Sequence, residues 1–284
     1  MLNKLKQIKL NTLEALCIEM AYLSDNWCFR GQAHDWPIKS SIDRFLDTIR
    51  DKNPILKNEN QNVFLEMKIL TQFFCNNEKI LKMHGIEEQN EENFILLQVL
   101  QQHYGYPTRL TDWTKNWKIA LFFCIEDNTQ SEEMVLWAIN MKNIHKVEDV
   151  ICDDKYLFPT ILFEDNKIHS YYNRLRDGIY LIDVPVFERI KAQEGLLLAS
   201  GHADDMIFEK HIFSSSWINN RCVKKYIISK TLRNDIEVFL EQNDINKEKL
   251  YPKEFLEMTT SDKKDLTSFA NELYPLVYSN LSEQ

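Results

Sequence analysis

The amino-acid sequence predicts an α+β fold, in which N-terminal helices pack on a largely antiparallel or mixed sheet. Apolar residues recur at helical spacing through much of the first half of the chain. Short apolar runs flanked by turn residues follow in the second half, and a helical pattern returns after Lys230. No strand–helix–strand unit repeats. We therefore expect one domain over residues 1–284, with a polar tail after about residue 255.

Four segments of the first half have the apolar spacing of helices: Asn11–Leu23, Asn60–Phe74, Phe94–Gln102 and Trp117–Glu126. Short polar side chains cap helices by accepting bonds from free backbone N–H groups. Asn11 or Thr12 is the expected N-cap of the first helix, and Asp112 or Thr114 that of the fourth.

The segments between these helices are expected to be a short strand and turns. Trp27–Phe29 predicts a strand that ends at Arg30-Gly31. We expect residues 31–58 to be irregular, because they are polar and contain proline breakers. Residues 103–114 are expected to be turn-like, because a glycine and a proline lie close together there.

Four short apolar runs in the second half predict strands: Met134–Ile139, Ile179–Val184, Leu196–Ala199 and Val223–Ile228. An amphipathic helix follows, with Leu232, Ile236, Phe239 and Leu240 on one face.

Composition disfavours several functional classes. The chain of 284 residues has only six glycines, and no phosphate-binding loop, dinucleotide fingerprint or nucleophile elbow occurs in it. A P-loop NTPase, an ordinary Rossmann enzyme and a serine hydrolase are thus not expected. The net charge of −9 argues against a basic footprint for duplex nucleic acid over the whole surface, but permits a local basic groove.

Cysteine usage and the N-terminal sequence indicate a cytoplasmic protein. The six cysteines are scattered without paired spacing, so reduced thiols are expected and no metal site. The first ten residues lack the apolar core of a signal peptide. The longest apolar run, Ile119–Ile125, is far shorter than the ~20 residues of a membrane-spanning helix, so no membrane partner is expected.

Two segments place reactive side chains in otherwise apolar surroundings. In the first, Phe29-Arg30-Gly31-Gln32, an arginine at a strand end would present a fixed guanidinium into a cleft, where it suits a phosphate or a carboxylate. The alternative is that Arg30 pairs with a surface carboxylate.

The second segment runs from Gln101 to Thr114. His103 would titrate near neutrality, and Arg109 and Asp112 would form a buried pair at the start of the following helix, whose positive end favours an anion. The alternative is structural: Asp112 caps the helix, Arg109 pairs with it, and the aromatic residues belong to the core.

These two segments resemble the signatures of the FRG domain family. Phe29-Arg30-Gly31 matches the motif that gives the family its name, and His103-Tyr104-Gly105-x-Pro107-Thr108-Arg109-Leu110-x-Asp112-Trp113-Thr114 matches its second motif. A third match, Arg189-x-x-x-Gln193-x-Gly195, has Leu197 or Leu198 where the family has phenylalanine. The resemblance covers roughly residues 20–255 and implies a bacterial or phage protein of toxin or defence type.

The string Cys28–Gln32 also resembles the first core strand of mono-ADP-ribosyltransferases, where an arginine holds the dinucleotide phosphate. This resemblance implies an ADP-ribosyltransferase-like fold and an NAD-consuming enzyme, with NAD as substrate and no metal. A carboxylate that stabilises an oxocarbenium-like transition state is then required. The expected catalytic residues are Glu194 (with Glu188 as runner-up), His103 and Arg30. The expected ligand-binding residues are Arg30, Gly31, Gln32, Tyr104, Arg109, Asp112, Trp113 and Gln193. Tyr104 or Trp113 would stack on a ring of the ligand. The acceptor would be a nucleic acid or a protein.

The alternative hypothesis is a non-catalytic sensor of nucleotides or nucleic acid. Its phosphate-tracking residues would be Arg30, Arg109, Arg174, Arg176, Lys224 and Lys225. Its stacking platforms would be Tyr104, Tyr106, Trp113 and Trp36. The stretch Tyr171–Gly178 interleaves aromatic residues with arginines in the required way. A metal-dependent nuclease using His103 and Asp112 is less favoured, because the sequence shows no cluster of carboxylates. The oligomeric state is left open.

Overall fold

The computed structural model describes residues 5–23, 25–52, 59–87, 94–127, 132–146, 161–164, 167–170, 179–183, 187–200 and 221–252. The first half contains β1 (Gln7–Leu10), α1 (Leu13–Ala21), β2 (Trp27–Gln32), α2 (Ser41–Lys52), α3 (Glu59–Asn76), α4 (Glu78–Met83), α5 (Phe94–His103), β3 (Leu110–Thr114) and α6 (Trp117–Glu126). The second half contains β4 (Glu133–Asn140), η1 (Met141–Asn143), β5 (His145–Lys146), β6 (Ile161–Glu164), β7 (Lys167–Ser170), β8 (Ile179–Ile182), α8 (Glu188–Ala192), β9 (Gly195–Ser200), β10 (Val223–Ser229), η3 (Lys230–Leu232), α11 (Arg233–Gln242) and α12 (Lys247–Leu250). The predicted polar tail and the Tyr171–Gly178 segment lie outside the described residues.

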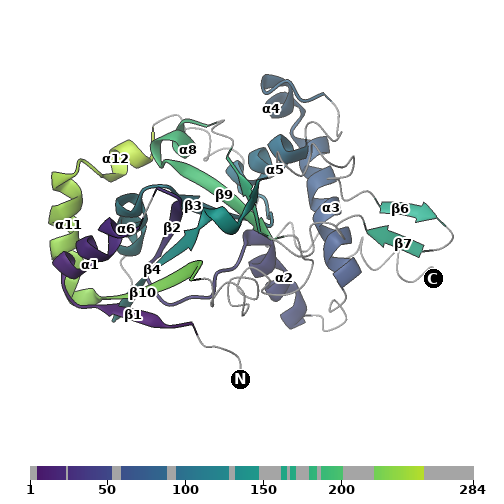
Figure 1. Ribbon diagram of the computed structural model, residues 1–284. Coiled ribbons are helices and arrows are strands. Elements are labelled where there is room, and N and C mark those ends of the chain that lie inside the picture. The colour runs from purple at the N-terminus through teal and green to yellow at the C-terminus, as the bar shows by residue number, and fades with distance from the viewer. Residues whose placement is uncertain are drawn as a thin grey trace.

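A mixed sheet forms the centre of the protein (Figure 1). Its strand order is β1-β10-β4-β2-β3-β9-β8-β5, and β6 pairs only with β7 in a separate hairpin. The β1–β10 and β5–β8 pairs are parallel, and the other neighbours in the sheet are antiparallel. The predicted α+β fold with a largely antiparallel sheet is therefore confirmed.

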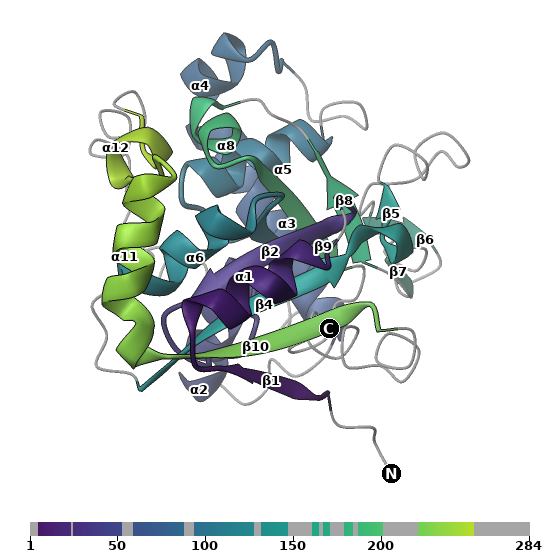
Figure 2. The same ribbon diagram turned by 60° about the vertical axis from the view of Figure 1, so that its left-hand side comes forward.

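Helices cover one face of the sheet in two groups (Figures 1 and 2). Helices α1, α6 and α11 pack on β2, β4 and β10 around buried residues such as Leu16, Leu121 and Tyr226. Helix α5 packs on β3 and β9 through Val99, which contacts Leu110 of β3. Thus α5 and α6 lie on the same face, on either side of the boundary between β2 and β3.

Two local predictions were wrong. Helix α2 lies inside the segment expected to be irregular, because Ser40 and Asp43 cap each other reciprocally: the Ser40 amide donates to the Asp43 carboxylate at 3.0 Å, and the Asp43 amide to the Ser40 hydroxyl at 3.2 Å. The last five residues of the expected turn form strand β3, which pairs with β9 along its whole length.

One of the two predicted N-caps is confirmed, and the other is wrong. Thr12 caps α1 by accepting from the amide of Ala15 at 3.1 Å, as predicted. Asn116, rather than Asp112 or Thr114, caps α6 by accepting from the amide of Lys118. Asp112 belongs to a strand and therefore keeps its carboxylate available for other contacts.

Three further properties concern only the part of the chain that the structure describes. No helix there is long and apolar enough to cross a membrane. No group of three or more metal-ligating side chains occurs there. The five cysteines in these residues are not joined in disulfide bonds, and burial raises the pKa of Cys124 to about 12.

Candidate functional site

The candidate site lies where the sheet opens between β2 and β3. Strand β2 pairs with β4 over six residues, and β3 with β9 over five, but β2 and β3 share only the pair Phe29–Thr114. Beyond that pair the two strands separate. Backbone groups and side chains of both strands therefore face a cavity instead of each other.

Gly31 allows this arrangement by letting helix α6 lie directly against β2. A Cβ atom at position 31 would be 1.8 Å from the carbonyl oxygen of Ala120 and 2.9 Å from the amide nitrogen of Cys124. Both contacts are with helix backbone, which cannot move aside locally. The glycine of the Phe-Arg-Gly motif is thus required by packing, not by backbone conformation.

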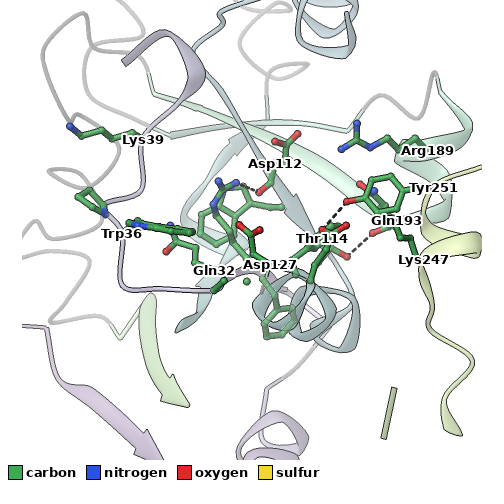
Figure 3. A pocket seen from close by; sticks show the side chains of 18 of the residues that line it. Gln32, Trp36, Lys39, Asp112, Thr114, Asp127, Arg189, Gln193, Lys247 and Tyr251 are labelled. Carbon is green, nitrogen blue, oxygen red and sulfur yellow. Dashed lines mark hydrogen bonds between the residues drawn. The ribbon is translucent and has the colours of Figure 1, made fainter. Parts of the chain in front are cut away.

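The cavity has a volume of about 760 Å³, which is within the usual range for a small-molecule site. Figure 3 shows Trp36 and Lys39 on one side, Arg189, Lys247 and Tyr251 on the opposite side, and Asp112 and Asp127 between them. The lining includes five cationic residues: Arg30, Lys39, Arg44, Arg189 and Lys247. Of the described carboxylates, three line it: Asp112, Glu126 and Asp127. The cavity is therefore locally cationic in a protein whose net charge is −9.

Arg30 lies half-buried in the opening, and its guanidinium forms no ion pair with a described residue. Its Nη1 donates to the backbone carbonyl of Asp112 at 2.6 Å, and its Nε is buried without a hydrogen-bond partner. Among the described residues, no carboxylate lies within ion-pair distance of it. Burial lowers the pKa of Arg30, the charge of Asp112 opposes this, and the charge of Arg44 adds to the lowering. Such a guanidinium is well suited to an anion, which would supply the missing charge and acceptors.

Asp112 is an exposed residue in a strand whose other members are buried. It lies on the face of the sheet that α5 and α6 cover. The Nε2 of Gln102 donates to both carboxylate oxygens, at 3.2 and 3.3 Å. Asp112 is thus a fixed carboxylate directed toward the cavity region rather than a helix cap.

Arg109 does not pair with Asp112 as expected. Residues 109 and 112 lie on opposite faces of the β3 strand path, since side chains alternate along a strand. Arg109 instead donates from Nε to Glu66 of α3 at 2.7 Å, and its Nη2 contacts the second oxygen of the same carboxylate. Both side chains are buried, and Arg109 does not line the cavity. We therefore interpret Arg109 as a structural residue.

His103 does not titrate near neutrality as expected. Its ring stacks on Phe187 with centroids 3.7 Å apart and planes 3° apart. Burial lowers the pKa of His103 to about 4, with smaller contributions from the charges of Arg189 and His84. His103 is neutral at physiological pH. It lines a smaller cavity, which is considered below.

The predicted stacking residues differ in their surroundings. Tyr104 and Tyr106 pack against Phe73 in the core beneath α3 and α5, and neither lines the large cavity. Trp113 borders the cavity but is 3% exposed, and its Nε1 donates to Thr111. Trp36 borders the cavity and is 41% exposed, so it is the indole accessible to a planar ligand.

Helix α8 places the third signature at the cavity. Arg189 and Gln193 are four residues apart, lie on the same side of the helix, and both line the cavity. Glu194, expected to be catalytic, does not line it: its exposed side chain accepts from Asn116 at 2.8 Å. Its φ of 43° marks a tight turn that directs it toward the start of α6. Glu188, the runner-up, forms an exposed pair with Lys191.

Gln32 lines the cavity, as expected, but its side-chain oxygen is already engaged. It accepts from Nε1 of Trp137 at 2.7 Å. Gln32 therefore shapes the wall between β2 and β4.

Sequence reasoning missed most residues of the cavity rim: Lys39, Glu126, Asp127, Lys247 and Tyr251. Tyr251 links three elements, because it donates to Glu126 at 2.9 Å and lies under the guanidinium of Arg189 at 5.3 Å. Burial raises the pKa of Tyr251, and the hydrogen bond to Glu126 raises it further. These residues are far apart in the sequence, so no local motif connects them. The fold alone brings them to the same cavity.

Most of the cations that the sensor hypothesis places in a basic groove do not line the cavity or lie outside the described residues. Lys225 is bonded to Asp35 at 2.6 Å and Lys224 lies 3.9 Å from Glu19, and neither lysine lines the cavity. Arg174 and Arg176 lie outside the described residues. Within the described chain, the cations that gather around one cavity besides Arg30 are Lys39, Arg44, Arg189 and Lys247, of which Lys39 is paired with Asp47 at 2.6 Å.

Residues 25–133 match the family model of the FRG domain. The chain contains an FRG domain. No curated protein and no solved structure matches the chain. The matched residues run from β2 to the start of β4, so the FRG domain match includes Arg30, Asp112 and the carboxylates of α6. The opposite rim, from Arg189 to Tyr251, follows the FRG match in sequence and completes the same cavity.

Proposed function

We propose that the FRG-domain protein binds NAD in the cavity between β2 and β3 and cleaves its nicotinamide–ribose bond. The observation that carries this proposal is the guanidinium of Arg30 in the opening of the sheet, which forms no ion pair with any described residue and whose Nε has no hydrogen-bond partner there. A charge removed from water without a partner is costly, so a site that retains one is suited to an anionic ligand. Arg109 provides the contrast, because its buried charge is neutralised by Glu66.

The remaining lining groups match the other parts of a dinucleotide. Phosphate oxygens would contact Arg30 and Arg44, with Lys39 nearby. Ribose hydroxyls are donors, and the carboxylates of Glu126 and Asp127 are acceptors. A base would stack on Trp36.

Asp112 would provide the carboxylate that the reaction requires. When the bond between the ribose carbon and the nicotinamide nitrogen breaks, nicotinamide leaves with the electron pair, and positive charge develops on the ribose. A fixed carboxylate stabilises that charge. Water then adds to the ribose carbon and releases a proton, giving ADP-ribose. In a transferase, a nucleophile of a nucleic acid or a protein would replace water.

Nicotinamide release from NAD tests this function. We expect release by the wild-type protein and by Glu133→Gln, an exposed residue remote from the cavity. Asp112→Asn keeps the shape of the side chain but removes its charge, so release should fall by about 10²- to 10³-fold. Absence of release by the wild-type protein, with and without nucleic acid or cell lysate as acceptor, would overturn the catalytic part of the proposal.

A second candidate function is a nucleotide sensor without catalysis, in a bacterial or phage defence system or a toxin. It is favoured by the cations on both rims of the cavity, which suit binding and do not themselves imply a reaction. The two functions differ in one result: a sensor would bind ADP-ribose or another nucleotide through Arg30 and release no nicotinamide.

A further inference from the structure

A second, smaller cavity adjoins the large one. Its volume is about 120 Å³, which corresponds to roughly four waters at ~30 Å³ each. Asp112, Arg189 and Gln193 line both cavities. The walls that belong to the smaller cavity alone are Val99, Gln102, His103, Ile190 and Leu197. Asp112 therefore stands at the boundary between a large cationic cavity and a small one that combines apolar walls with polar side chains.

A chain of hydrogen bonds fixes the carboxylate at this boundary. The hydroxyl of Thr108 donates to Oε1 of Gln102, which orients the amide so that Nε2 faces Asp112. Both carboxylate oxygens then accept from that Nε2. Since both ends of the Gln102 amide are used, Gln102 positions Asp112 and is not itself a ligand-binding group.

The other walls suit a flat ring that carries an amide. Val99, Ile190 and Leu197 are apolar, and the neutral ring of His103 is held in place by its stack on Phe187. Gln193 donates from Nε2 to the carbonyl of Leu250 at 3.1 Å. Its Oε1 accepts no hydrogen bond from the described residues and is left as an acceptor for an N–H group.

We infer that the smaller cavity is the leaving-group subsite and binds nicotinamide, an inference that rests on the proposed function. The amide N–H₂ of nicotinamide donates to Oε1 of Gln193, and the ring packs between the apolar walls. Asp112, at the boundary, then lies beside the bond that joins the ring to the ribose. The positively charged ring of intact NAD favours a position next to this carboxylate, which a neutral adenine ring does not require.

Arg189 is the cation that also lines this cavity. Its guanidinium lies 5.3 Å from the centre of the Tyr251 ring, on the side of the large cavity. Arg189 thus places a cation where the two cavities meet, and its charge helps to lower the pKa of His103 in the smaller one.

Calorimetry with two fragments of NAD tests the subsite. Nicotinamide alone and ADP-ribose alone are titrated into the wild-type protein and three variants: Gln193→Leu, Val99→Phe and Arg30→Met. Gln193→Leu removes the acceptor, and Val99→Phe fills the cavity, so each should weaken nicotinamide binding by about tenfold or more. Val99→Phe should leave ADP-ribose binding unchanged, because Val99 lines only the smaller cavity. Arg30→Met should do the reverse. Nicotinate, which lacks the amide donor and is repelled by Asp112, should bind the wild-type protein more weakly than nicotinamide.

The results of these titrations distinguish an error in the subsite assignment from an error in the proposed function. If NAD is cleaved but nicotinamide binding is insensitive to both Gln193→Leu and Val99→Phe, the subsite assignment is wrong and the proposed function stands. If ADP-ribose does not bind and NAD is not cleaved, the proposed function fails, and the leaving-group role fails with it. Circular dichroism of each variant establishes that it is folded. Because the two variants change different elements, the end of α8 and α5, a folding defect in one leaves the other as a valid test.

Discussion

The guanidinium of Arg30 donates to the backbone carbonyl of Asp112 at 2.6 Å, although the two residues are 82 positions apart in the chain. This bond joins two distant segments of the FRG domain match across the opening between β2 and β3. It satisfies a β3 carbonyl at the point where the two strands separate. It also holds a cation and a carboxylate-bearing residue at the same cavity, and the proposed function depends on that combination.

The two signature arginines should differ in their effect on stability. Arg109→Met leaves Glu66 buried without its partner, so the free energy of unfolding should fall by about 3–5 kcal/mol. Arg30→Met removes one hydrogen bond but also a charge that forms no ion pair with a described residue, so the change should stay within about 1 kcal/mol. Urea unfolding of both variants measures this difference. A larger loss for Arg30→Met than for Arg109→Met would mean that the roles are assigned the wrong way round.

Gly31 and Gly105 should respond to alanine for different reasons. Gly31→Ala places a methyl group 1.8 Å from the Ala120 carbonyl, so it should cost about 3 kcal/mol or more and separate α6 from β2. Gly105 has open space around it but a φ of +80°, so Gly105→Ala should cost only about 1–2 kcal/mol. Thermal unfolding compares the two. Equal losses would contradict the close packing of α6 on β2.

His103 should make the protein less stable in mild acid. Its pKa is lowered to about 4 in the folded state, so below the ordinary value of 6.5 the unfolded chain binds a proton that the folded chain does not. The contribution of His103 to stability is therefore complete above pH 6.5 and declines as the pH falls toward 4. Urea unfolding between pH 7 and pH 4.5 should show this decline, and His103→Gln should reduce it. An NMR titration that places the midpoint of His103 near 6.5 would refute the buried, stacked position.

Asp112 and Glu194 should differ in their effect on activity. Glu194→Gln alters an exposed contact with Asn116 outside the cavity, so nicotinamide release should match that of the wild-type protein. Asp112→Asn should lower kcat by about 10²- to 10³-fold with little effect on the melting temperature. The kinetic constants of both variants decide the matter. Loss of activity in Glu194→Gln alone would restore the assignment that the sequence favoured.

Local patterns predicted the longer helices except α2, and five of the ten described strands, because periodicity and capping act over a few residues. The position of Arg30 in a cleft also followed from its strand and the glycine after it. Strand β3 was missed because its threonines and Asp112 hide the alternation, although Thr111 and Thr114 use their hydroxyls to bond backbone carbonyls. Helix α2 was missed because prolines on both sides outweighed a capping pair.

The rest of the site depends on tertiary contacts. Arg109 and Arg30 look equivalent in sequence, and only the approach of Glu66 from α3 neutralises one of them. Gln193 and Glu194 are adjacent in the sequence. Gln193 lines the cavity, whereas the turn at Glu194 directs the Glu194 side chain away from it. The rim residues of α12 lie more than 100 positions beyond Asp112, so no local spacing connects them with it.

A crystal structure of the protein with ADP-ribose is the most direct test of NAD binding at Arg30 and Asp112. ADP-ribose is the expected product and no longer carries nicotinamide, so it stays intact in the crystal. We expect the pyrophosphate to lie in the opening between β2 and β3, with oxygen atoms within hydrogen-bond distance of Arg30. The ribose that carried nicotinamide should lie beside Asp112. Ordered ADP-ribose bound elsewhere, with Arg30 still bonded only to the Asp112 carbonyl, would contradict this binding mode.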